Sequence, residues 1–101
     1  MYNIVLLCEY GASTSLVAES IEKAAKDRGI EAVVNAYSTS ELANVAGTAD
    51  CILLGPQVRF RLPKFKKEYP EVPMDSMAPA DYGRLNGENL LNQALKLLEK
   101  E

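Results

Sequence analysis

The sequence predicts an α/β fold in which a four-stranded parallel sheet, in the order 2-1-3-4, carries helices on both faces. Short apolar runs alternate four times with segments of helical periodicity, and glycine, proline or hydroxyl residues separate them. Strands that alternate with helices are joined by right-handed crossovers and form a parallel sheet. In this order the topological switch point falls between the first and third strands, where ligands bind in open α/β sheets.

The first strand and helix follow from the first thirty residues. Residues 2–7 are nearly all apolar, as in a central strand buried on both faces. A helix is expected from Ser13 or Thr14 to Arg28, and Gly29 supplies its stop. One face of this helix is apolar and is expected to be buried: Leu16, Val17, Ile21, Ala24 and Ala25.

The middle of the chain predicts two more strands and two helices. Residues 31–37 and 50–54 are expected to be strands, and residues 54–57 a turn. Between the strands, Ser38 and Glu41 have the spacing of a capping box that opens a short helix ended by Gly47. A further helix covers about residues 60–69, and its regular part begins near Leu62 with Pro63 in the first turn. Its apolar face is Val58, Leu62, Phe65 and Tyr69.

The last thirty residues predict an edge strand, a loop and a helix. Residues 72–77 suit an edge because Pro73 has no N–H for a ladder hydrogen bond. Residues 78–87 are expected to form a loop and residues 88–100 a helix. The inward side chains of this helix are Leu90, Leu91, Ala94, Leu95 and Leu98.

Composition indicates one globular domain, residues 1–101, in the cytoplasm. The net charge of −3 argues against nucleic acid as a partner. No apolar run approaches the ~20 residues of a membrane span, and no secretory signal is present, so we expect no membrane insertion. The two cysteines match neither a disulfide framework nor a metal spacing, and histidine is absent. We therefore expect no metal or cofactor, and we also expect the chain to be a monomer.

Cys8 is the candidate nucleophile, at the carboxyl end of the first strand. Free backbone N–H groups and the positive end of the following helix dipole would form an anion site beside its thiol and favour the thiolate. A lone cysteine after a strand is more often a packed apolar residue, but hydroxyl groups and a glycine are poor core material. The expected phosphate loop is Glu9, Tyr10, Gly11, Ala12, Ser13, Thr14 and Ser15.

Two further groups of residues are candidates around this site. The first is a possible rim formed by Gly55, Pro56, Gln57, Asp81 and Tyr82, although Asp81 is equally well a turn carboxylate and Tyr82 a packed ring. The second is a possible docking surface for an acidic partner, for which a merely solvated helix face is the alternative. Its members are Arg59, Arg61, Lys64, Lys66 and Lys67. Cys51 is expected to be buried.

Four sequence segments together resemble the B component of the lactose/cellobiose type of the bacterial phosphotransferase system. They are L-L-C-x-x-G-x-S-T-S-L-V at 6–17, A-D-C-I-L-L-G-P-Q-V at 49–58, L-P at 62–63 and D-Y-G-x-x-N-G at 81–87. The resemblance implies that Cys8 accepts a phosphoryl group from a histidine of the A component, held by the loop at 9–15. It also implies transfer to a sugar on the membrane C component: lactose, cellobiose, another β-glucoside or chitobiose.

The sequence departs from this family at Glu9 and Tyr10, where small neutral residues are common. A Glu9 carboxylate inside the loop would repel a phosphate, so we expect it to point outward. The low-molecular-weight tyrosine phosphatases share the predicted fold, but their chemistry needs an arginine six residues after the cysteine, where this chain has Thr14. A non-catalytic phosphate-binding or thiol-sensing module is the other alternative.

Overall fold

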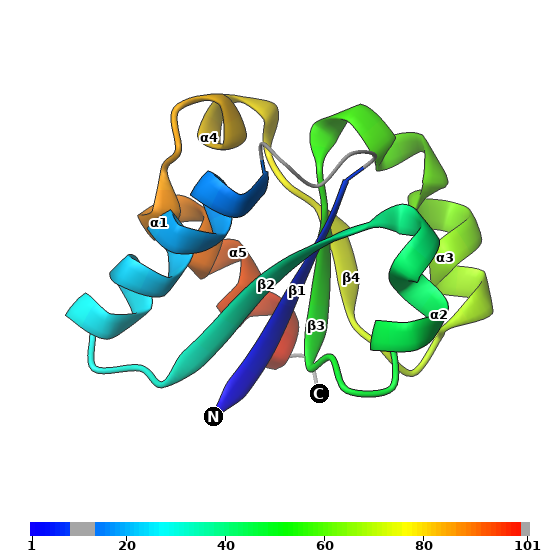
Figure 1. Cartoon of the computed structure of the whole chain (residues 1–101), viewed down its shortest axis with the longest axis horizontal. Helices are drawn as coiled ribbons and strands as arrows, with labels where there is room; N and C mark the ends of the chain where they lie inside the picture. Colours follow the sequence, from blue (N-terminus) through cyan, green and yellow to red (C-terminus); the bar gives the residue numbers. More distant parts are fainter. Residues whose placement is uncertain (9–13, 100–101) are drawn as a thin grey trace.

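The computed structural model describes residues 1–8 and 14–99 and has the predicted α/β architecture (Figure 1). The strands are β1 (Tyr2–Cys8), β2 (Ala32–Ser38), β3 (Cys51–Leu54) and β4 (Met74–Ser76). The α-helices are α1 (Thr14–Asp27), α2 (Leu42–Val45), α3 (Leu62–Glu68), α4 (Pro79–Gly83) and α5 (Gly87–Glu99). Two 3₁₀ segments, η1 (Thr39–Glu41) and η2 (Pro56–Arg61), precede α2 and α3.

The four strands form one parallel sheet in the order β2-β1-β3-β4, which confirms the predicted topology. The register places Leu7 of β1 between Tyr37 of β2 and Leu54 of β3. The chain passes from β1 to β2 on one side, and β3 lies on the other side of β1. The topological switch point therefore lies at the carboxyl ends of β1 and β3. Figure 1 shows these ends on the side of the molecule that also holds α4, η2 and the first turn of α1.

The central strand contributes side chains to two separate hydrophobic clusters. Ile4 and Leu6 pack with α1 and α5 on one face of the sheet, whereas Val5 and Leu7 pack with α2, η2 and α3 on the other. This alternation is that of a strand buried on both sides. Cys51 is fully buried in the first cluster, as predicted.

Helix α1 begins at Thr14, as predicted, and ends one residue before the predicted Arg28, but one of its five expected core residues is wrong. Val17, Ile21 and Ala25 are buried, whereas Leu16 is 58% exposed. Leu16 stands nine positions before Ala25, and at about 3.6 residues per turn this separation places the two on opposite sides of the helix. Gly29 ends the helix with a φ of 72°, as its position predicted.

The segment 78–87, predicted to be a loop, contains the short helix α4. Pro79 supplies the fixed φ of a first helical turn, and the Tyr82 N–H donates to the Ala78 carbonyl at 2.9 Å. The Tyr82 ring packs against the first hydrophobic cluster, and this packing stabilises a helix too short to form by itself.

The remaining differences concern element limits and one core position. The predicted turn at 54–57 runs into η2, and β4 is limited to three residues because Val72 is bonded in a turn to the Tyr69 carbonyl. In α5, Leu97 is buried, and Leu95 and Leu98 are only partly buried. None of the helices within residues 1–8 and 14–99 has the length and apolar character needed to cross a bilayer.

Candidate functional site

Cys8 and Gly55 lie side by side at the carboxyl ends of β1 and β3. The Gly55 N–H donates to the Leu7 carbonyl at 2.7 Å, so the ladder between the two strands continues to this point. A Cβ built on Gly55 would lie 3.4 Å from the Cys8 Cβ. The thiol therefore occupies the switch point of the sheet, where the fold favours a ligand site.

The Cys8 side chain is enclosed but lies outside both hydrophobic clusters. The residue is 4% exposed. Because side chains alternate along a strand, Cys8 projects from the same face of β1 as Ile4 and Leu6, toward the α1 side. It is thus the last inward position of β1, at the boundary between the core and the carboxyl edge.

The expected phosphate loop falls almost wholly outside the described residues. Residues 9–13, and with them the orientation of Glu9, are not described. Helix α1 begins at Thr14, six positions after Cys8, and Ser15 in its first turn is exposed. A helix of 14 residues thus starts shortly after the thiol, on the face of the sheet to which Cys8 belongs.

The turn after β3 brings Gln57 back toward Cys8. Pro56 starts η2, and the Val58 N–H donates to the Gly55 carbonyl at 3.0 Å, which closes the turn. A Cβ on Gly55 would lie only 2.8 Å from Oε1 of Gln57, so the Gln57 amide lies against the Gly55 Cα. Cys8, Gly55 and Gln57 form one continuous group.

Asp81 and Tyr82 lie in α4, near the same edge of the sheet (Figure 1). The Asp81 carboxylate accepts a hydrogen bond from the Asn89 side-chain amide at 3.0 Å, and its carbonyl accepts from the Asn86 N–H at 2.8 Å. These contacts join α4 to the start of α5. Tyr82 is partly buried against the first cluster. Both residues have a structural role, and a role at the site's rim stays a prediction.

The basic segment at 59–67 starts near the site and continues along α3. It carries five positive charges and no negative charge, in a chain whose net charge is −3. Its cations make no ion pair among the residues that the structure describes. Arg61 is half-buried, with its guanidinium 5.5 Å from the Phe60 ring centre; the other four are exposed: Arg59, Lys64, Lys66 and Lys67.

Three exposed apolar side chains on this side of the molecule were not predicted from the sequence. Phe60 is 70% exposed, Leu16 58% and Leu85 44%. Phe60 stands between Arg59 and Arg61, and this flanking pair of charges could have indicated that its side chain is exposed. The exposure of Leu16 could have been inferred from its helical position, which is opposite to that of Ala25. Of the three, Phe60 is an exposed aromatic side chain between two arginines, and both residue types are enriched at partner-binding surfaces.

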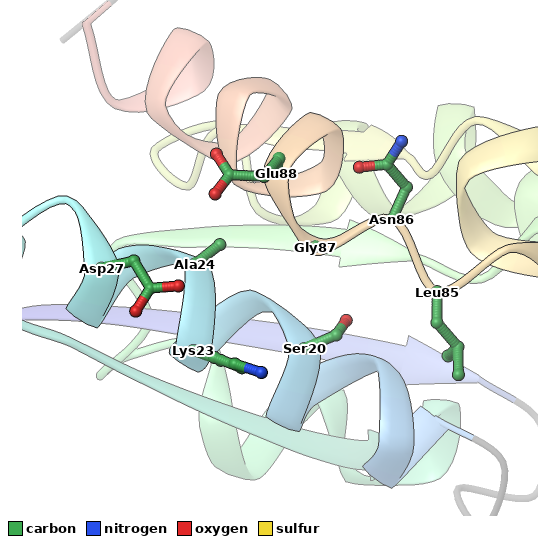
Figure 2. A pocket seen from close by; sticks show the side chains of 8 residues that line it. All are labelled: Ser20, Lys23, Ala24, Asp27, Leu85, Asn86, Gly87 and Glu88. Carbon is green, nitrogen blue, oxygen red and sulfur yellow. The ribbon is translucent and has the colours of Figure 1, made fainter.

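A groove of about 380 Å³ lies between α1 and the start of α5 (Figure 2). Ser20, Lys23 and Asp27 line it from α1, and Leu85 to Glu88 line it from the other side. Cys8 does not line it. The groove is lined by one ammonium group, from Lys23, and by the carboxylates of Asp27 and Glu88. This mixture of charges does not indicate a particular class of ligand. The described residues hold no cluster of potential metal ligands.

Comparison with known proteins identifies relatives over nearly the whole chain. The sequence model "PTS system, Lactose/Cellobiose specific IIB subunit" matches residues 3–93. A cellobiose-specific EIIB component from Lactococcus lactis subsp. lactis is 40% identical, and a galactose-specific one from subsp. cremoris is 39% identical, each over 94% of both chains. An oligo-β-mannoside-specific EIIB component from Bacillus subtilis is 30% identical over 97% of both.

Solved structures agree on the fold. The solution structure of the cellobiose-specific IIB component from Borrelia burgdorferi has a TM-score of 0.81 at 35% identity and covers 98% of this chain and 93% of its own. A lactose-specific IIB domain from Streptococcus pneumoniae has a TM-score of 0.84 at 19% identity, over 94% and 95%. A YwlE mutant from Bacillus subtilis, at 15% identity, has a TM-score of 0.63 over 98% and 99% and shows that the low-molecular-weight tyrosine phosphatase fold is shared.

Proposed function

The chain belongs to the lactose/cellobiose-specific IIB subunits of the sugar phosphotransferase system, and from this premise we propose that Cys8 carries a phosphoryl group between two partner proteins. The observation that carries the proposal is the position of Cys8. It ends the central strand at the switch point, beside Gly55 and six residues before α1. A thiol placed there can accept an anionic group that backbone N–H groups stabilise.

The chemical step is a displacement at phosphorus. The Cys8 thiolate supplies the electron pair for a new S–P bond, and the N–P bond of a phosphohistidine on the A component breaks. The imidazole nitrogen keeps the electron pair of the broken N–P bond and takes up a proton. The proton of the Cys8 thiol has already passed to solvent. We propose that the N–H groups of residues 9–15 bind the phosphoryl oxygens, because oriented amides hold such charge without a cation.

Two partners are needed on this account. The A component donates the phosphoryl group, and the membrane C component presents the sugar that receives it from Cys8. We propose that the basic segment 59–67 binds an acidic surface of a partner and that the chain acts in the cytoplasm, as a monomer without metal or cofactor. The sugar belongs to the range implied by the family, namely lactose, cellobiose, other β-glucosides and chitobiose, and is selected by the C component.

The test is coupled sugar phosphorylation. Vesicles that contain the C component are supplied with phosphoenolpyruvate, the general components and the A component. The wild-type chain should support sugar phosphate formation, and the Cys8→Ser variant should not. Equal rates with the two proteins would refute the proposal.

A phosphatase activity is the alternative that the shared fold suggests. In that chemistry an arginine six residues after the cysteine stabilises the phosphoryl group during transfer to water. Thr14 occupies this position and has no positive charge. We therefore expect no turnover of an aryl phosphate, and catalysed release of phosphate from such a substrate would favour the phosphatase.

A further inference from the structure

The terminal amide of Gln57 and the Cys8 side chain both border the position where a Gly55 side chain would lie. A Cβ on Gly55 would lie 2.8 Å from Oε1 of Gln57 and 3.4 Å from the Cys8 Cβ. Both side chains therefore face the same unfilled position on Gly55. Gln57 as a residue is exposed, whereas Gly55 is buried. The end of the Gln57 side chain is thus turned back over the carboxyl end of β3.

Gly55 is needed for space rather than for an unusual backbone. Its φ of −62° and ψ of 151° are open to any amino acid. The missing side chain leaves the position that the Gln57 amide occupies. Glycine here lets a polar group from η2 lie next to the carboxyl end of β3, in a position that a Cβ would displace.

This amide has unused hydrogen-bonding capacity. Gln57 makes no side-chain hydrogen bond with the residues that the structure describes. By contrast, the Gln93 amide nitrogen donates to Asp75 Oδ2 at 3.1 Å, as a glutamine with a structural role does. A glutamine amide offers two N–H donors, and a rotation of its end exchanges nitrogen and oxygen at no steric cost.

We propose that Gln57 donates a hydrogen bond to the phosphoryl group on Cys8, from the β3 side of the site. This inference rests on the proposed function and adds a side chain to the backbone groups expected at the start of α1. A hydrogen bond to a charged acceptor is stronger than one between neutral groups. Gln57 therefore stabilises the phosphorylated form relative to the free thiol and is a phosphoryl-binding residue.

The test is the equilibrium of phosphoryl transfer between the A component and this chain, measured by ³¹P NMR of the mixed proteins. An equilibrium constant depends only on the end states. A residue that merely aids docking therefore changes the rates of transfer but not the equilibrium constant. Gln57→Ala should shift the equilibrium about tenfold toward the phosphohistidine. Gln57→Glu should shift it further, because a carboxylate repels the phosphoryl group.

Gly55→Ala supplies an independent variant. Its Cβ conflicts with the Gln57 amide at 2.8 Å but meets Cys8 Cβ and the Leu7 carbonyl only at 3.4 and 3.5 Å, so the amide should move while the fold stays. The shift should resemble that of Gln57→Ala, and the double variant should add nothing. A change of about twofold or less is smaller than the effect of one such hydrogen bond. Equilibrium constants within that range of wild type in both Gln57→Ala and Gly55→Ala would overturn the assignment. A wild-type chain without phosphocysteine would overturn the proposed function as well, so the two failures are distinct.

Discussion

Ser20 and Gly87 bring α1 and α5 into direct backbone contact. A Cβ on Gly87 would lie 2.1 Å from the carbonyl oxygen of Ser20, closer than any side chain can approach. Gly87 is buried as the first residue of α5, so the missing side chain sets the separation of the two helices. This contact fixes the position of α1, whose first turn includes the last two residues of the candidate phosphate loop, Thr14 and Ser15.

Gly87→Ala should destabilise the protein, because the added methyl group meets backbone that cannot rotate away. The expected loss in the free energy of unfolding is about 1–3 kcal/mol, the usual cost of overpacking. Urea unfolding measures it. Gly83→Ala is the matched control, since a Cβ there meets nothing within 4 Å. Equal midpoints for the two variants would contradict the packing argument.

Glu22 on α1 supports the edge strand β2. Its Oε2 accepts a hydrogen bond from the Val34 N–H at 2.8 Å. Because β2 has a neighbouring strand on one side only, this carboxylate provides a partner for one of its backbone donors. Glu22→Ala should cost about 1–3 kcal/mol, because a partly buried donor loses its acceptor. Denaturant unfolding beside Glu19→Ala, an exposed position of the same helix, gives the comparison; equal losses would show that the bond contributes nothing.

The basic segment should control the rate of encounter with the A component. Replacing Arg59, Lys64, Lys66 and Lys67 by glutamine should lower the second-order rate constant of phosphoryl transfer about tenfold at low salt. The difference should vanish near 1 M salt, where the Debye length is about 3 Å. Stopped-flow mixing measures both rates.

Lys23→Gln/Lys26→Gln is the control for this surface, since both lysines are exposed on α1, away from the segment. The control should transfer at the wild-type rate. A rate independent of charge at 59–67 would mean that this face is only solvated.

The sheet was predictable because its signals are local and agree with one another. The run Ile4–Leu7 and the run Cys51–Leu54 are fully apolar, and such runs identify central strands of a parallel sheet. Gly29 and Pro63 marked a helix end and a helix start, and the structure has both. The alternation of elements then restricts the order of strands.

The errors have two sources, tertiary packing and helical geometry. Helix α4 forms because Tyr82 gains a packing partner on the first cluster, a contact that its own segment does not reveal. The error at Leu16 is of the other kind, because its helical position opposite the buried Ala25 follows from the sequence spacing alone. Within the site, the position of Cys8 at a strand end followed from the sequence. The contact of Gln57 with Gly55 did not, because it depends on the backbone turn of η2.

The most direct measurement is the site of phosphorylation. The chain is incubated with labelled phosphoenolpyruvate, the general components and the A component, and the label is mapped by mass spectrometry. Cys51 is fully buried in the core, so Cys51→Ala is the control and should carry as much label as wild type. We predict label on Cys8 in both proteins and none on Cys8→Ser. Equal labelling of Cys8→Ser, or label on Cys51, would contradict the account.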